Sequence, residues 1–341
     1  MIFQHAKNGI EFPAHNFKRY TGLLLGFSLA AVLAGCGGGG GSASPSTPAA
    51  TSGVSKGVIT ALGSIFVNGV EFSISSSKIT SNKSSGSGSD LRVGRIVTVR
   101  GGKSDDLHGD ATEVEYKDNL SGPVDVAPAA GSSSLQILGQ TVLVDTSSAS
   151  VAAGKTVFQG FTSLSQLSAG SVLEVSGLPD ANGAIHATYL EFKGTLAAGT
   201  AIEIKGAIAN LDTTAKTFTI NALTINYASA ALNDLSGTIA NGLFVEVKGT
   251  GAGYASGTSP TLSATKIENE SGDAAGDENH DLAVEGLVSG FSAGSNSFKV
   301  SGQAVTTGSL SLAGIGNNAR VEVEGTLLNG ILVATKIKLE H

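Results

Sequence analysis

One pattern of alternating apolar residues recurs four times along the chain, and it limits what the chain can fold into. Each copy has a segment in which apolar and polar residues alternate up to a glycine. An Ala-Thr pair follows downstream, with an apolar residue two positions after the threonine. The glycines are Gly101, Gly177, Gly249 and Gly325, and the pairs are Ala111-Thr112, Ala187-Thr188, Ala264-Thr265 and Ala334-Thr335. A period of two is typical of strands with one buried face, so the pattern predicts four copies of one β-rich unit.

The spacing of the copies indicates what kind of repeat this is. Successive strand glycines lie 76, 72 and 76 residues apart, whereas solenoid repeats are about 20–45 residues long. The longer period predicts four small domains in a row, each burying its own apolar interior, rather than one stacked superhelix. The 47 glycines among 341 residues would supply many turns, which favours an all-β fold. A glycine that follows an alternating strand is also expected at a bulge or sharp bend.

Read in register, the copies predict five strands each. The first strand passes through a glycine, and the second and third strands form a hairpin, which in the first copy turns at Asn68-Gly69, a pair typical of type I′ turns. A variable stretch with room for one or two helical turns leads to a turn residue before the fourth and fifth strands. The first-strand glycines are Gly57, Gly122, Gly206 and Gly286, and the turn residues are Gly94, Gly170, Gly242 and Asn318. This order predicts four tandem, five-stranded, OB-like barrels, a closed design without sheet edges.

The combined pattern resembles a bacterial family described only as a domain of unknown function (family 5666), which occurs in tandem on exported lipoproteins. The motifs that carry the resemblance are Gly-x-Ile, Phe-x-Val-x-Gly, Leu-x-x-Gly-x-x-Val-x-Val-x-Gly and Ala-Thr-x-Ile, spread over most of residues 54–340. The second copy departs from them at Pro123 and Leu135, and it has an extra stretch around 154–161. The resemblance implies the fold and brings no catalytic or binding residues with it.

The first 35 residues have the features of a secretion signal. Lys18 and Arg19 precede an apolar run over residues 21–33, which is too short as a helix to span the ~30 Å hydrocarbon core of a membrane. The run ends in Leu-Ala-Gly before Cys36, the chain's one cysteine. This ending resembles the lipobox of bacterial lipoproteins, which implies cleavage before Cys36 and its lipidation. Gly37, rather than aspartate, after the cysteine then favours the outer membrane.

The predicted organisation has six parts. A signal peptide (1–35) and a Gly/Ser/Pro-rich tether (36–53) precede four barrel repeats, called copies 1 to 4 below: 54–117, 118–193, 200–270 and 281–341. Without residues 1–35 the chain keeps 18 basic and 27 acidic residues, a net charge of −9. Such a charge repels nucleic acid, and the chain has no tryptophan for base stacking. The expected partners are the membrane, through the lipidated N-terminus, and an unknown envelope protein or glycan.

Two glycine-rich segments were weighed as catalytic or cofactor motifs. Ser292 lies in a Gly-x-Ser-x-Gly sequence, the pattern of a hydrolase nucleophile elbow, but a strand rather than a helix is expected after it. Its register places Ser292 in the hairpin between the first two strands of copy 4. Residues 249–253 faintly resemble a dinucleotide loop but lack its third glycine, and they are expected to be a hairpin tip between the last two strands of copy 3. No cofactor is predicted.

Two acidic runs, each with a histidine, are weak candidates for a metal site. The first comprises Asp105, Asp106, His108 and Asp110, and the second Asp273, Asp277, Glu278, His280 and Asp281. Carboxylate-rich loops can hold Ca²⁺, which takes six to eight oxygen ligands, but neither run has the spacing of a known calcium loop. The simpler interpretation of both is a solvated turn.

The sequence therefore favours a lipid-anchored, non-enzymatic envelope protein that acts as a binding or spacer module. Two alternatives from other classes stay open. One is an envelope hydrolase that uses Ser292, and the other is a cation-dependent adhesin that uses the acidic runs.

Overall fold

The computed structural model describes residues 51–232, 235, 239–270 and 277–340. Within them the chain is all-β, apart from two single 3-10 turns at Gly88–Asp90 and Leu164–Gln166. None of the helical segments in these ranges combines the length and apolar character needed to cross a membrane. The predicted signal peptide, Cys36, Asp273 and nearly all of the predicted tether lie outside the described residues.

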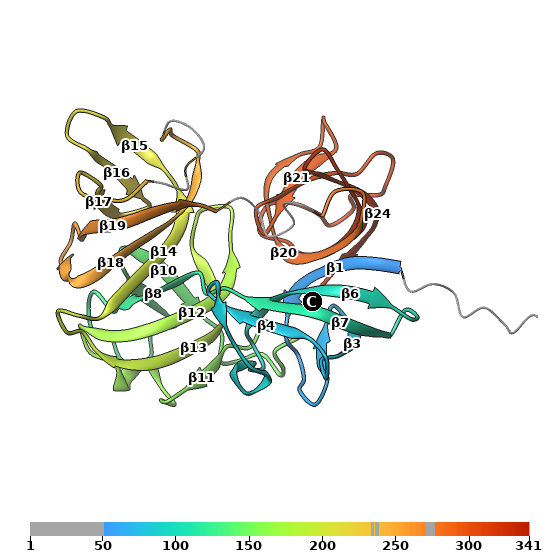
Figure 1. Cartoon of the computed structure of the whole chain (residues 1–341), viewed down its shortest axis with the longest axis horizontal. Coiled ribbons are helices and arrows are strands. Elements are labelled where there is room, and N and C mark those ends of the chain that lie inside the picture. The colour runs from blue at the N-terminus through green and yellow to red at the C-terminus, as the bar shows by residue number, and fades with distance from the viewer. Residues whose placement is uncertain (1–50, 233–234, 236–238, 271–276, 341) are drawn as a thin grey trace, which may run out of the picture. The chain divides into compact units, whose positions relative to one another are not determined.

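Copy 4 is a closed five-stranded barrel (Figure 1, orange to red). Its strands are β20 (Asp281–Ser292), β21 (Ser297–Val300), β22 (Gln303–Thr306), β23 (Arg320–Leu328) and β24 (Ile331–Leu339). Strands β20, β21 and β22 pair antiparallel, β22 pairs parallel with β24, and β23 lies antiparallel between β24 and β20. This ladder confirms the OB-like order predicted from the sequence.

The same ladder recurs in the other three copies. Copy 1 contains β1 (Thr51–Val58), β2 (Ile65–Val67), β3 (Val70–Ser73), β6 (Ile96–Lys103) and β7 (His108–Tyr116). Copy 2 contains β8 (Leu120–Pro123), β9 (Ser134–Ile137), β10 (Gln140–Val144), β12 (Ser171–Pro179) and β13 (Ile185–Thr195). Copy 3 contains β14 (Ala201–Ala207), β15 (Ala209–Asp212), β16 (Thr217–Ile220), β17 (Leu223–Asn226), β18 (Phe244–Ala255) and β19 (Thr261–Asn269). In copies 1 and 2 the first and second strands meet only at the bridges Ala61–Phe66 and Val124–Ile137.

The turn chemistry follows the sequence expectations. Asn68 and Gly69 have φ of 52° and 75°, as a type I′ turn requires. The four predicted turn residues before the fourth strand all have positive φ: Gly94 (95°), Gly170 (84°), Gly242 (85°) and Asn318 (70°). Each donates its backbone N–H to the carbonyl two residues after the first-strand glycine, at 2.8–2.9 Å. One local geometry therefore joins the first and fourth strands in every copy.

Sequence analysis missed short strands in the connector between the third and fourth strands. In copy 1 the connector forms β4 (Lys78–Ser81) and β5 (Ser84–Ser85), and in copy 2 it forms β11 (Val157–Gln159). Strands β4 and β11 pair parallel with the fifth strands β7 and β13. In copy 3 one parallel bridge, between Ala231 and Lys266, takes their place. The predicted helical turns are present in copies 1 and 2 as the two 3-10 turns.

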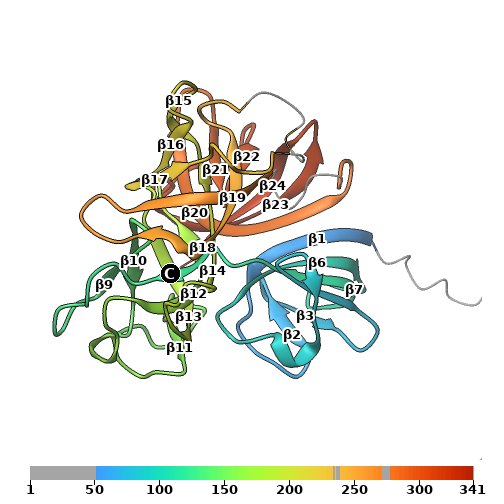
Figure 2. The ribbon, with the colours of Figure 1, turned by 60° about the vertical axis from the view of Figure 1, so that its left-hand side comes forward.

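The strands of different copies join into two sheets of twelve strands each. Strand β1 of copy 1 pairs parallel with β20 of copy 4, from Gly53–Asp281 to Lys56–Val284 (Figure 2). Strand β8 of copy 2 pairs antiparallel with β14 of copy 3. Copies 2 and 3 also share one hydrophobic cluster, whereas copy 1 has a cluster of its own and the cluster of copy 4 includes Val54 of copy 1. The expectation that each copy buries its own interior independently is therefore wrong for copies 2 and 3.

The repeated glycine and Ala-Thr motif forms a β-bulge, as expected for the glycine. The register between the fourth and fifth strands shifts next to each of the four glycines, which pairs each with the alanine of its Ala-Thr motif. The threonine is the extra residue, and its hydroxyl donates to the carbonyl just before the glycine, in the pairs Thr112–Arg100, Thr188–Ser176, Thr265–Lys248 and Thr335–Glu324, at 3.1–3.2 Å. The strands continue past the glycine rather than end there; β6, for example, runs to Lys103.

At three of these bulges, those of Gly101, Gly177 and Gly325, a carbonyl oxygen of the partner strand leaves no room for a Cβ, whereas a Cβ on Gly249 would meet the Leu262 side chain first. A Cβ added to Gly325 would lie 2.1 Å from the carbonyl oxygen of Val333 on the partner strand. We expect Gly325→Ala to lower the free energy of unfolding by about 1–3 kcal/mol or more, because a backbone atom has to move. Gly294→Ala is the matched control, since its Cβ would meet no heavy atom within 4 Å. Chemical denaturation of both variants measures the difference, and equal stabilities would contradict this account.

The shared cluster of copies 2 and 3 predicts shared unfolding. Val247 is fully buried in that cluster. We expect Val247→Asp to cost several kcal/mol, because it buries a charge. Copies 2 and 3 should melt together while copies 1 and 4 persist. Hydrogen exchange followed copy by copy along a thermal ramp checks this, and loss of protection in copy 3 alone would show that the two copies are energetically independent.

Candidate functional site

The carboxylates of the first acidic run hold their own hairpin. Asp105 lies at the tip between β6 and β7 and accepts hydrogen bonds from the backbone N–H of Leu107 (2.7 Å) and His108 (2.8 Å) and from the His108 ring (2.9 Å). These hydrogen bonds lower the pKa of the Asp105 carboxyl, and the bond from the Leu107 N–H has the largest effect. The carboxyl therefore stays ionised at neutral pH. Asp106 and Asp110 are exposed.

The second acidic run is also engaged within the chain. Asp277 pairs with Arg100 of copy 1, with Oδ2 3.2 Å from Nη2. Glu278 accepts from the backbone N–H groups of Asn329 and Gly330 at 2.8 and 2.7 Å. His280 is exposed, and Asp281 begins β20. The Asp277 ion pair joins copy 1 to the segment before copy 4, and the Glu278 hydrogen bonds join that segment to the β23–β24 hairpin.

The two acidic runs do meet at one cavity of about 380 Å³ beside the β1–β20 pairing. Its lining includes Asp105, Asp106, Asp281, Glu324, Phe72 and Leu282. Asp110, Asp277, Glu278 and His280 do not line it. Among the described residues, no group of three or more His, Cys, Asp or Glu side chains is placed to hold a metal ion. The cavity mixes carboxylates with the edge of the apolar core and does not gather ligands around one point.

Ser292 is the last residue of β20 and pairs with Ser297 across the β20–β21 hairpin, where sequence analysis placed it. Its hydroxyl accepts a hydrogen bond from the Ser295 hydroxyl at 2.7 Å. A serine hydroxyl cannot serve as the general base that activates a nucleophile. The surroundings of Ser292 are therefore those of a polar hairpin rather than of a nucleophile elbow.

The glycine-rich segment 249–253 is not the expected hairpin tip. It is a wide irregularity inside β18, between the pairs Gly249–Ala264 and Tyr254–Leu262. Gly251 lies against the segment that joins copies 2 and 3, and its N–H donates to the Thr200 carbonyl at 2.8 Å. A Cβ there would lie 2.1 Å from the Ala197 carbonyl oxygen. Close backbone packing therefore explains this glycine without a ligand.

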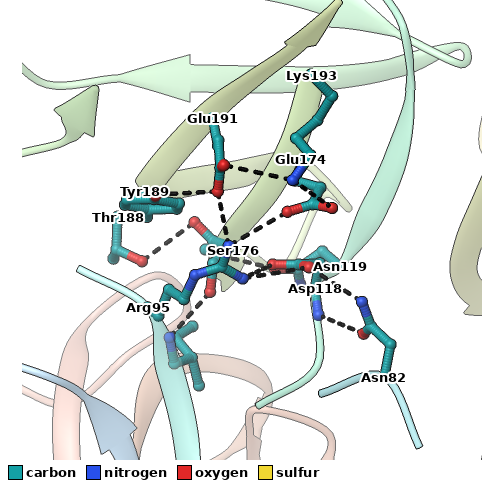
Figure 3. Close-up of polar contacts among 12 residues, drawn as sticks. Asn82, Arg95, Asp118, Asn119, Glu174, Ser176, Thr188, Tyr189, Glu191 and Lys193 are labelled. Atoms are coloured by element: carbon teal, nitrogen blue, oxygen red, sulfur yellow. Dashed lines mark hydrogen bonds and ion pairs between the residues drawn. The ribbon is translucent and has the colours of Figure 1, made fainter. Parts of the chain in front are cut away.

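The densest polar site lies at the junction of copies 1 and 2, around Arg95 (Figure 3). Arg95 follows Gly94, whose positive φ turns the chain into the fourth strand. A Cβ on Gly94 would lie 2.5 Å from the carbonyl oxygen of Thr188 in copy 2. Copy 1 therefore approaches copy 2 closely at Gly94, and the next side chain, Arg95, projects onto strands β12 and β13.

Three carboxylates and two aromatic rings surround this guanidinium. Nη1 of Arg95 lies 3.1 Å from Asp118, and Nη2 lies 3.2 Å from Glu174 and 2.8 Å from Glu191. The guanidinium carbon lies 4.5 Å from the centre of the Tyr116 ring and 4.8 Å from that of Tyr189. Rings at these distances attract a cation through their π faces. We call these six residues the Arg95 cluster.

Flanking hydrogen bonds tie the two copies at the same place. The Ile96 backbone N–H of copy 1 donates to the Ser176 hydroxyl of copy 2 at 2.9 Å. The amide of Asn82 donates to Asp118 at 3.2 Å, and Lys193 lies 3.3 Å from both Glu174 and Glu191. Positive charge from Arg95 and Lys193 thus offsets most of the three carboxylates.

Burial sets the electrostatics of the cluster. The side chains of Arg95 and Asp118 are only 5% and 4% exposed. Burial raises the pKa of the Asp118 carboxyl to about 6, although Arg95 pulls it down. Burial opposes the charge of Arg95, yet Asp118 and Glu174 raise the pKa of its guanidinium above the usual range. Asp118 can therefore bind a proton near pH 6, in a nearly fully buried position at the junction of the two copies.

Lys83, from the β4–β5 turn of copy 1, makes a second junction with copy 3. Its ammonium lies 3.0 Å from Glu246, 3.7 Å from Glu268 and 3.3 Å from Glu270. Glu246 occupies in copy 3 the register position that Glu174 occupies in copy 2, and Glu268 likewise corresponds to Glu191. Copy 1 therefore inserts Arg95 into the acidic face of copy 2 and Lys83 into the equivalent face of copy 3, where its Lys117 also lies 3.2 Å from Glu270.

Sequence analysis did not single out Arg95 or Lys83. The aligned positions of Arg95 in the other copies are Ser171, Leu243 and Ala319. A lone arginine at a position that is otherwise small or apolar was the available signal for a buried partner. Its carboxylate partners lie as far as 96 residues away in the chain, so the sequence could not identify them.

The raised pKa of Asp118 predicts a pH dependence. The folded pKa near 6 exceeds the ordinary value of 3.8, so between these values the folded chain holds a proton that the unfolded chain has released. The free energy of unfolding should therefore fall as pH rises from about 4 to 6, by on the order of 2–3 kcal/mol from this group. Denaturation at a series of pH values should show this fall weakened in Asp118→Asn. The variant Asp110→Asn, at an exposed site, should keep the full fall in the free energy of unfolding. If both variants weaken the fall equally, the assignment to Asp118 is wrong.

Comparison with known proteins places the repeats in one family. The family described as Domain of unknown function (DUF5666) matches the chain at residues 56–115, 121–191, 205–268 and 285–338. These matches are four tandem copies and cover more than half of the chain. No curated protein matches it.

Proposed function

The chain belongs to the DUF5666 family, and we propose that it is a lipid-anchored, non-enzymatic protein of the bacterial cell envelope that acts as a rigid binding or spacer module. The observation that carries the proposal is the way its copies are locked together. Sheet pairing joins copy 1 to copy 4 and copy 2 to copy 3, and the cations Arg95 and Lys83 join copy 1 to both middle copies. A chain built this way holds the loops of different copies at fixed positions.

The strength of these junctions supports a rigid module over independent beads. Buried, multiply bonded ion pairs are costly to break one partner at a time, because each leaves an uncompensated charge. Inter-domain interfaces held only by exposed polar contacts would allow relative motion by default. The Arg95 cluster is buried and its guanidinium contacts three carboxylates. A fixed arrangement of four copies suits a spacer or a scaffold that presents loops to a partner.

The residues weighed for chemistry support a non-enzymatic role. The Ser292 hydroxyl accepts a hydrogen bond from the Ser295 hydroxyl in an exposed hairpin. The carboxylates of Asp105 and Glu278 accept backbone hydrogen bonds at hairpin tips. That of Asp277 forms an ion pair with Arg100 of copy 1. The buried acid of the Arg95 cluster is out of reach of a substrate. We therefore propose that these side chains stabilise the assembly of copies, and that the partner is an envelope protein or glycan rather than nucleic acid.

The anchor proposal rests on the N-terminal sequence. Residues 1–35 read as a secretion signal that ends before Cys36 in a sequence resembling a lipobox, and Gly37 favours the outer membrane. Two or more acyl chains on one cysteine would hold the protein on a bilayer firmly, because each buried methylene contributes about 0.8 kcal/mol. The net charge of −9 without the signal would keep the repeats off anionic head groups.

Replacing the lipidation residue tests the anchor. We expect Cys36→Ser to move the protein from the membrane pellet to the soluble fraction of a bacterial expression host, because no acyl chain can then be attached. Ser42→Ala, a change of similar size in the adjoining tether, is the matched control and should leave the protein in the pellet. A Cys36→Ser protein that pellets as before would refute the lipid anchor.

A further inference from the structure

The fifth strand of a copy has two neighbours along its outer edge. The third strand pairs with its first half, as β3 does with β7 at Glu71–His108 to Ser73–Asp110. The connector strand pairs with its second half, as β4 does at Lys78–Glu113 to Ser81–Tyr116. Copy 2 repeats this with β10 and β11, and copy 3 with β17 and the single bridge at Ala231. Three copies therefore cover both halves of this edge.

In copy 4 only the first half of the edge is covered. Strand β22 pairs with β24 from Ala304–Ile331 to Thr306–Val333. From Thr335 to Leu339, β24 is paired with β23 on its inner side, and no strand among the described residues pairs with its outer side. The connector of copy 4, near Leu310 and Leu312, packs on the core and forms no strand.

The burial of the central apolar residue shows what this edge lacks. The residue two positions after the threonine is fully buried in the covered copies, as Val114, Leu190 and Ile267 are each 0% exposed. The equivalent Ile337 of copy 4 is only partly buried. Within the part of the chain that the structure describes, the backbone at Ile337 also lacks a hydrogen-bond partner on this side of β24. Ile267 donates its N–H to the connector at Ala231 (2.9 Å), and the N–H of Ile337 points the same way without an acceptor among the described residues.

We propose that the open edge of β24 from Thr335 to Leu339 binds an extended segment of a partner protein by parallel strand addition, with an apolar residue opposite Ile337. Strand addition is a common way for a sheet edge to bind a peptide: main-chain hydrogen bonds supply affinity, and alternate side chains supply specificity. The inference names a partner class for the proposed binding module and rests on that function.

The covered copies define the chemistry of the segment. Ile79 and Phe158 are the connector residues that face Val114 and Leu190, so an apolar side chain belongs opposite Ile337. In copy 1, Lys78 faces Glu113 and pairs with it at 3.2 Å. Copy 4 has Lys336 at the position of Glu113, but Lys336 already pairs with Glu324 at 2.6 Å, and the equivalent Lys266 of copy 3 lies opposite Ala231. This position therefore requires no charge on the partner, and the apolar residue opposite Ile337 defines the segment.

The chain's own tether is a poor occupant. Residues 37–50 contain only Gly, Ser, Ala, Pro and Thr, so they offer no large apolar side chain to lie opposite Ile337. An exposed strand edge is also a risk for self-association. Lys336 and Lys338 lie on this strand and are the kind of residue that blunts edges against like copies. We therefore assign the edge to a different protein and not to a second copy of this chain.

A grafted connector tests the edge on the full chain. Residues 76–83, the copy 1 connector, are appended after His341 with the change Lys78→Ala, through a flexible linker of about ten Gly and Ser residues. The alanine copies Ala231, which lies opposite Lys266 in copy 3. The linker reaches roughly 17 Å, about the distance back along β24 to Lys336, and gives an effective concentration on the order of 1 mM. The matched control carries the same graft with the further change Ile79→Ser, which removes the apolar side chain opposite Ile337. The readout is amide hydrogen exchange at Ile337 and Leu339 by NMR.

In the parent chain, Ile337 and Leu339 should exchange faster than Lys336 and Lys338, whose N–H groups face β23. The graft that keeps Ile79 should slow exchange at Ile337 and Leu339 by about tenfold or more, and the control graft should slow it less. Equal or absent protection with both grafts would overturn the proposal. Protection in the parent chain that rises with protein concentration would overturn it too, because a second copy would then be the occupant. Neither result bears on the Cys36→Ser experiment, so failure of the edge and failure of the anchor are distinguishable.

Discussion

The fold depends on one β-bulge that each copy repeats, where a glycine on the fourth strand packs against the fifth. In copies 1, 2 and 4 the backbone of the fifth strand comes too close to this glycine for a side chain. The missing side chain lets the partner carbonyl approach, as the carbonyl of Val333 approaches Gly325. The threonine is the unpaired extra residue of the bulge, and its hydroxyl donates a hydrogen bond to the carbonyl before the glycine, as Thr335 does to Glu324. A bulge increases local twist, which allows five short strands to close into a barrel. The two motifs that define the repeat in the sequence are thus the two halves of a single structural device.

A second constraint acts between copies. The outer faces of copies 2 and 3 carry glutamates at equivalent positions, and copy 1 supplies a cation to each face through Arg95 and Lys83. In copy 4 the equivalent of Glu191 and Glu268 is Lys338, which lies 2.8 Å from Glu340. Charge within copy 4 is therefore compensated locally. The four copies share a fold but differ in surface charge. Copy 1 supplies cations, copies 2 and 3 supply carboxylates, and copy 4 pairs its charges internally.

The sequence predicted the parts of this molecule that are local. Alternating residues, Asn68-Gly69 and the bulge glycines each act within a few residues, and the order of strands in each barrel followed from them. The connector strands were missed because segments such as Lys78–Ser81 are short, polar and without clear alternation. The sharing of sheets and the Arg95 cluster were missed for another reason: Arg95 and its partner Glu174 are 79 residues apart, and a single sequence does not record such pairings. The acidic runs were identified by composition, yet their geometry turned out to be hairpin tips and one ion pair.

The pairing of the first strand with the last copy also shapes how the chain can fold. Val58 donates its N–H to Glu285, a residue 227 positions later. At about 5–20 residues per second, synthesis of that interval takes roughly 10–50 s. During this time β1 can form its antiparallel ladder with β6, but its other edge lacks the strand that covers it in the finished protein. The pairing of copy 1 is therefore complete only once copy 4 has been made. A chain that stops after its third copy would leave this edge of β1 unpaired and prone to association with other strands.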